Sequence, residues 1–188
     1  MRYADLTKYR YSINYPGRKV FNVGWLGEGR DFPTGDERGL YEKLLPYCAH
    51  SIEPKPGVYP CPICGETMPS KQWGTKKFSL GHSEIRVVIE DVWYASPTMI
   101  LHYVERHHYR PPLDFIRACF HGVDPTSQEY SDALYELQRS AGPRRHRHAK
   151  MTAILGSRIF GTTPPPEVLQ NIGDYDFLDE LEAKCDPS

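Results

Sequence analysis

Two cysteines three positions apart constrain this chain most, because their spacing is typical of a metal-binding turn. Cys61 and Cys64 lie in the run Pro60-Cys61-Pro62-Ile63-Cys64-Gly65, where one tight turn aims two thiolates at the same tetrahedral ion. Gly65 suits such a turn, because a residue without Cβ lets the backbone fold back and point amides at the sulfurs. The motif predicts a zinc knuckle.

A histidine-bearing helix downstream offers further ligands. Ser96-Pro97 predicts a helix start, and Pro111-Pro112 must end the helix. Between them lie His102, His107 and His108, and the spacing of His102 from either later histidine is within the range of two-Cys two-His zinc sites. An ideal helix points His102 and His107 in different directions, so a site using both requires a widened last turn.

The interval between the two halves of the site is long. Thirty-seven residues separate Cys64 from His102, where a DNA-reading zinc finger has about twelve, so the sequence predicts the ligands and not the finger's function. Cys48 competes with a histidine as ligand, and His108 competes with His107. In the alternative without metal, the cysteines are a small buried pair and the histidines a polar helix face. The predicted ligands, with Zn²⁺ as cofactor, are Cys61, Cys64, His102 and His107.

The interval itself predicts a β-hairpin. Residues 84–89 and 92–94 are rich in β-branched and aromatic side chains, and Glu90-Asp91 divides them. Glu84 and Arg86 alternate with apolar residues, so they share one strand face. They are either an ion pair that stabilises the hairpin or catalytic groups.

The catalytic interpretation requires a zinc ion with an open position. Glu84 or Glu105 then acts as base and Arg86 polarises the substrate of a hydrolase. A deaminase is a related possibility, because His82-Ser83-Glu84 and Pro60 to Cys64 match both elements of the deaminase signature. Their order along the chain is the reverse of that signature.

Several of these segments occur together in one family. The motifs are Leu80 to Val87, Tyr94 to Pro97 and His102 to Pro112, with Tyr3 to Thr7 and Val23 to Leu26 before them. The chain resembles, from Met1 to Phe120, a family of uncharacterised bacterial proteins that carry a domain of unknown function. The resemblance implies no activity, and it favours His107 over His108 as ligand.

Bulk composition narrows the class of protein. The 188 residues carry a formal charge of −1, which argues against nucleic-acid binding through the overall field. Five cysteines and no signal-like opening segment predict a reduced, cytoplasmic setting. No apolar run approaches the roughly 20 residues that span a membrane, and thirteen tyrosines suggest a surface suited to contacts.

The remaining segments predict a mixed architecture. Strands on either side of Pro16-Gly17 form an N-terminal hairpin, and residues 36–48, 112–121 and 124–140 have helical spacing. We therefore expect an α+β fold: an N-terminal β-hairpin, a core of knuckle, hairpin and helix like an expanded two-Cys two-His site, and a helical C-terminal part. Residues 1–163 form one zinc-stabilised domain, followed by a Pro-led acidic tail at 164–188.

A basic cluster interrupts the C-terminal part. Its members are Arg144, Arg145, Arg147 and Lys150, which bind phosphates or an acidic protein surface, or form a solvated loop. The sequence thus favours a zinc-binding interaction or regulatory protein that binds another protein. A zinc-dependent enzyme is the second possibility, and nucleic-acid binding through residues 144–150 is the third.

Overall fold

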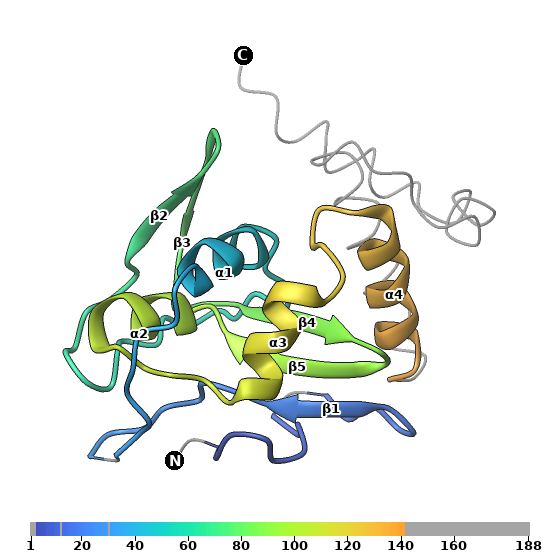
Figure 1. Ribbon diagram of the computed structural model, residues 1–188, viewed down its shortest axis with the longest axis horizontal. Coiled ribbons are helices and arrows are strands. Elements are labelled where there is room, and N and C mark those ends of the chain that lie inside the picture. The colour runs from blue at the N-terminus through green and yellow to red at the C-terminus, as the bar shows by residue number, and fades with distance from the viewer. Residues whose placement is uncertain (1–2, 12, 30, 142–188) are drawn as a thin grey trace. The chain divides into compact units, whose positions relative to one another are not determined.

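The computed structural model describes residues 3–11, 13–29 and 31–141 and confirms the α+β class. A three-stranded sheet has the order β1-β5-β4, and β2 and β3 form a separate two-stranded sheet (Figure 1). The strands are β1 (Lys19–Asn22), β2 (Ser70–Trp73), β3 (Lys76–Ser79), β4 (Glu84–Ile89) and β5 (Val92–Pro97). The helices are α1 (Leu40–Ala49), α2 (Ile100–His107), α3 (Leu113–His121) and α4 (Gln128–Arg139).

The central hairpin is formed by β4 and β5, as the sequence predicts. They pair antiparallel across Glu90 and Asp91, whose positive φ angles of 49° and 63° are those of a tight primed turn. The predicted helix start at Ser96-Pro97 is wrong, because Ile85 and Glu84 pair with these two residues. Pro97 is tolerated there because β1 accompanies β5 only as far as Ala95, so no neighbouring strand needs its missing amide.

The N-terminal hairpin is present in a loose form. Lys8 and Phe21 make an isolated antiparallel bridge, and the Tyr9 amide donates to the Val20 carbonyl at 2.8 Å. On its other side β1 pairs in parallel with β5, placing Lys19 opposite Val92. Sequence alternation did not indicate this long-range pairing.

Strand β4 is covered on both faces. Helices α1 and α3 pack against it (Figure 1), while Tyr9 and Tyr15 approach its polar face, each ring lying near the Arg86 guanidinium. Glu84 and Arg86 are therefore 1% and 0% exposed. Their side chains form an ion pair with 2.9 Å between Nη1 and Oε2.

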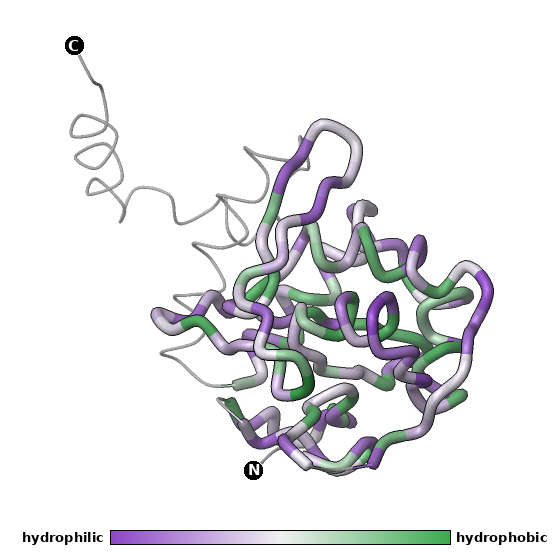
Figure 2. Tube along the Cα trace, turned by 90° about the vertical axis from the view of Figure 1, so that its left-hand side faces the viewer, coloured by the Kyte–Doolittle hydropathy of each residue, from purple (hydrophilic) through white to green (hydrophobic). Residues whose placement is uncertain are grey.

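The β2–β3 hairpin projects from the rest of the first unit in Figure 1, and Figure 2 shows hydrophilic residues along it. The sequence analysis missed this hairpin. Its signal is Gly74, which has a φ of 56° at the turn between Trp73 and Lys76.

The chain divides into two compact units, Met1–Tyr130 and Ser131–Ser188. The described part of the second unit ends at Ala141, so the predicted boundary at residue 163 and the acidic tail lie outside the described residues. None of the helices in the described ranges has the length and hydropathy that crossing a bilayer requires.

Candidate metal centre

The Cys-x-x-Cys segment folds as a knuckle around the Cys61 sulfur. The Ile63 amide donates to this sulfur at 3.5 Å, and the Gly65 amide donates to the Cys61 carbonyl at 2.9 Å. Gly65 has a φ of 75°, in the left-handed region that favours glycine. The Cys61 amide donates to the Glu66 carbonyl at 2.8 Å, which closes the loop. Both thiol groups are thereby held on one short turn.

Helix α2 supplies the two histidines, one from its first turn and one from its last residue. Beyond it, His108 has a φ of 51°, and its amide donates to the Tyr103 carbonyl five residues back. The Tyr109 amide donates to the same carbonyl at 3.1 Å. An ordinary helical bond spans four residues, so this last turn is wide. The widened turn expected for a site using His102 and His107 is therefore present.

The four side chains meet at one point. The Cys61 sulfur lies 3.3 Å from His107 Nε2, and the Cys64 sulfur lies 3.4 Å from His102 Nε2. The two Nε2 atoms are 3.2 Å apart, and all four ligand atoms lie within 4.8 Å of one another. The cluster is thus positioned to hold one metal ion between two sulfurs and two nitrogens.

The electrostatic surroundings suit metal binding. Burial lowers the pKa of His102 and of His107, so both imidazoles are neutral at pH 7, the state that binds a metal. Burial also raises the pKa of the Cys61 thiol, and a bound cation would compensate for this by favouring the thiolate. Cys61 and His102 are buried, whereas Cys64 is exposed, so solvent reaches one side of the site.

A carboxylate outside the cluster faces one of these histidines. Glu66 Oε2 lies 3.7 Å from His102 Nδ1, the ring nitrogen opposite the one in the cluster. Carboxylates at this place orient a metal-bound imidazole and fix its tautomer. The sequence analysis missed Glu66, although an acidic residue two positions after Cys64 is a readable signal.

The two competing ligands lie elsewhere. Cys48 is buried in α1 and donates to the Thr98 carbonyl across 3.7 Å. His108 Nδ1 is 2.7 Å from Asp36 Oδ1, and its side chain is 63% exposed. Neither residue belongs to the cluster that the described residues form.

The candidate catalytic residues are also outside this cluster. Glu84 and Arg86 pair with each other in the interior, and Glu105 pairs with Lys71 of β2. His82 is separate from the cluster as well, so the deaminase signature does not form a single site in the described part. The basic residues Arg144, Arg145, Arg147 and Lys150 lie outside the described residues.

Comparison with known proteins gives one match. Neither a curated protein nor a solved structure shows significant similarity to the chain. A family model described as a domain of unknown function, DUF7919, matches residues 1–120, a range that contains the knuckle, the central hairpin and α2. The chain therefore belongs to the DUF7919 family.

Proposed function

We propose that this chain is a zinc-binding interaction protein, in which a structural zinc site presents a surface to another protein. The observation that carries the zinc assignment is the meeting of two sulfurs and two imidazole nitrogens within 4.8 Å. Sites with this ligand composition and four protein ligands are typical of structural zinc.

The separations within the cluster agree with zinc. A tetrahedral ion with Zn–S of about 2.3 Å and Zn–N of about 2.05 Å sets its sulfur and nitrogen ligands about 3.5 Å apart and its two nitrogens about 3.3 Å apart. The corresponding separations here are 3.3 Å, 3.4 Å and 3.2 Å. The cluster therefore needs only a slight expansion to accept the ion.

Zinc at this place links segments that are distant in the sequence. The knuckle has few backbone hydrogen bonds of its own, whereas α2 follows directly from the central hairpin. Structural zinc in small sites contributes folding free energy directly. We infer that the ion fixes the knuckle on α2.

Exposed apolar side chains in the sequence around the knuckle support a protein partner. Four of the six large hydrophobic side chains that are exposed in the described ranges belong to residues 58–68, with exposed fractions of 41–44%. They are Val58, Tyr59, Ile63 and Met68. Apolar and aromatic residues gathered on a surface are typical of interaction sites. A metal that orders this segment would also order the surface.

The zinc assignment is tested by metal analysis and X-ray absorption on the purified chain. We expect one zinc per chain with two sulfur and two nitrogen neighbours, and loss of zinc in Cys61→Ser and His102→Ala. His108→Ala is the matched control and should retain the metal, because that histidine pairs with Asp36. Absence of zinc from the unmodified protein would refute the assignment.

The same measurement separates the enzyme alternative. An oxygen neighbour in place of one protein ligand would indicate an open position, as a zinc-dependent hydrolase requires. The observation that supports an enzyme as the second candidate is the exposure of Cys64 on one side of the site. Four protein ligands would favour the structural role.

The partner is tested by cross-linking at the apolar surface. A photoreactive residue at position 63 should capture a defined protein in the source cells, and one at Leu113 of α3, which is more exposed than Ile63, should not. Capture at position 63 should also be lost with Cys64→Ser. Equal capture at both positions would refute a specific surface at the knuckle.

Nucleic-acid binding through residues 144–150 is tested by a gel shift that Arg144→Ala with Arg145→Ala abolishes.

A further inference from the structure

A second site lies beside the buried ion pair, in a cleft that includes parts of the N-terminal segment, the connector before the knuckle and the start of β4. The empty space between its walls, counted together with open solvent, is about 480 Å³. Its lining combines aromatic rings with polar groups, and Lys55 Nζ lies 5.3 Å from the centroid of the Tyr11 ring. The aromatic residues are Tyr11, Trp25, Tyr59 and Tyr103, and the polar residues are Lys55, His82, Ser83 and Glu84.

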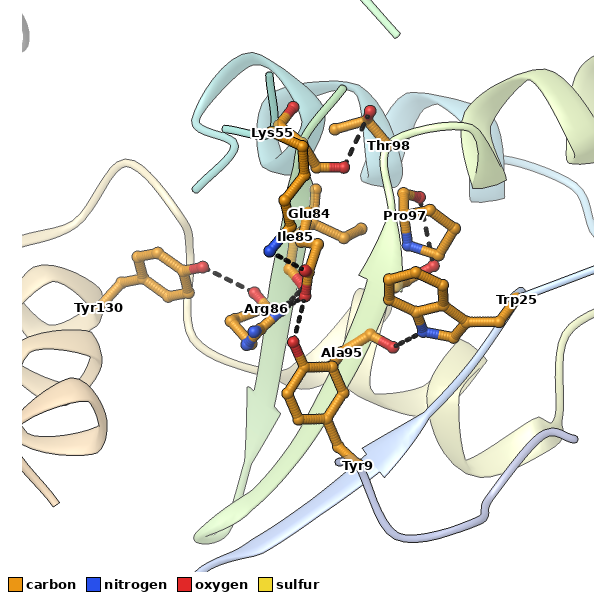
Figure 3. Close-up of polar contacts among 12 residues, drawn as sticks. Tyr9, Trp25, Lys55, Glu84, Ile85, Arg86, Ala95, Pro97, Thr98 and Tyr130 are labelled. Atoms are coloured by element: carbon orange, nitrogen blue, oxygen red, sulfur yellow. Dashed lines mark hydrogen bonds and ion pairs between the residues drawn. The ribbon is translucent and has the colours of Figure 1, made fainter. Parts of the chain in front are cut away.

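Among the polar residues of the lining, Lys55 is the cation and Glu84 the carboxylate. Glu84 Oε1 lies 3.2 Å from Lys55 Nζ, and Glu84 Oε2 lies 2.9 Å from Arg86 Nη1 (Figure 3). Tyr9 also donates its hydroxyl to Oε2 at 2.7 Å. One carboxylate is thus shared by two cations. The Lys55 side chain is 17% exposed and the Arg86 side chain is fully buried, so Lys55 is the cation that a ligand can reach.

Two neighbouring polar atoms have no hydrogen-bond partner among the described residues. They are His82 Nδ1 and Ser83 Oγ, both buried, and Ser83 as a whole is only 7% exposed. The Lys55 amide donates to the His82 carbonyl at 2.6 Å, which places these groups beside the lysine. Buried polar atoms normally have partners. The lack of partners for these two atoms favours a ligand whose oxygen atoms can bond to them.

The aromatic part of the lining suits a flat ring. Trp25 is held by its indole N–H, which donates to the Ala95 carbonyl at 3.0 Å. The Tyr11 and Trp25 ring centroids are 4.8 Å apart, and the Tyr11 and Tyr59 hydroxyls are 3.3 Å apart. Aromatic rings fixed in this way bind another ring by stacking and edge contacts.

We propose that this cleft binds a small aromatic carboxylate. The carboxylate group lies at Lys55 and accepts hydrogen bonds from the ammonium group and from Ser83, while the ring lies against Trp25 and Tyr59. Charge-assisted hydrogen bonds of this kind give orientation as well as affinity. The inference does not depend on the identity of the metal.

The test is calorimetric titration of the full chain with benzoate, salicylate and indole-3-acetate, each compared with its uncharged amide. We expect at least one carboxylate to bind and its amide to bind about tenfold more weakly or worse. Lys55→Met should weaken binding by a similar factor. Lys77→Met is the matched control, because Lys77 is an exposed lysine on β3, and its affinity should be unchanged.

Folding of the variants is checked by thermal unfolding. Lys55→Met leaves the Glu84–Arg86 pair in place, and Ser83→Ala is the second variant should Lys55→Met not fold. Ser83→Ala should weaken carboxylate binding and leave binding of the amide unchanged. The proposal is overturned if no carboxylate binds at millimolar concentration, if the amides bind equally well, or if the folded variants keep full affinity.

Discussion

The buried ion pair allows a directional prediction, because its two members differ in the partners that remain when the other member is removed. Breaking such a pair by removing one partner costs about 3–5 kcal/mol. Glu84→Gln leaves the Arg86 guanidinium 0% exposed and charged, since arginine does not lose its proton in proteins. We expect a loss at the upper end, about 5 kcal/mol.

Arg86→Met should cost less. Glu84 then keeps Lys55 at 3.2 Å and the Tyr9 hydroxyl at 2.7 Å, so its carboxylate still has a cation and a hydrogen-bond donor. We expect a loss at the lower end, about 3 kcal/mol.

Urea unfolding followed by tryptophan fluorescence measures these losses. The double variant Glu84→Gln with Arg86→Met is the control, because it removes both charges at once. Its loss should be smaller than the sum of the single losses, as expected for residues in contact. A larger loss for Arg86→Met than for Glu84→Gln, or additive losses in the double variant, would refute the reasoning.

Three further predictions concern packing, hydrogen bonding and metal release. Gly122→Ala should cost about 2–3 kcal/mol in urea unfolding, because its Cβ would lie 2.2 Å from the Val88 carbonyl oxygen, whereas Gly57→Ala meets no atom within 4 Å and should be neutral. Tyr130→Phe should cost about 1 kcal/mol in the same assay, since the buried hydroxyl donates to the Arg86 carbonyl at 2.7 Å. Bound metal should be released only as the pH falls below about 6.5, because burial lowers the pKa of both histidines in the cluster. A zinc-sensitive dye would record the released metal. Release already at pH 8 would contradict the expectation.

The sequence was most informative where the signal is local. Cysteine spacing indicated the knuckle, and two prolines indicated the end of the histidine-bearing helix. The use of both His102 and His107 as ligands required a widened last turn. The β4–β5 hairpin followed from two β-rich runs around Glu90-Asp91. These features depend on backbone preferences within a few residues, which is why patterns in the sequence reveal them.

Features that depend on distant contacts were not readable. Alternation along β4 placed Glu84 and Arg86 on one face, but nothing in the strand itself showed that Tyr9 and Tyr15 would approach that face. Ser96-Pro97 has the composition of a helix start, yet pairing with β4 keeps it extended. At Ser96-Pro97, tertiary pairing outweighed local propensity.

The parallel pairing of β1 with β5 has a consequence for how the chain is made. The ribosome completes β1 at Asn22 long before it reaches Val92. In the folded sheet, Val92 lies opposite Lys19 of β1. Contacts of such large sequence separation slow folding, since the intervening chain must first be closed into a loop. Until β5 has been synthesised, the aromatic rings of the nascent tyrosine-rich segment stay uncovered. Chaperones would encounter the protein at that stage.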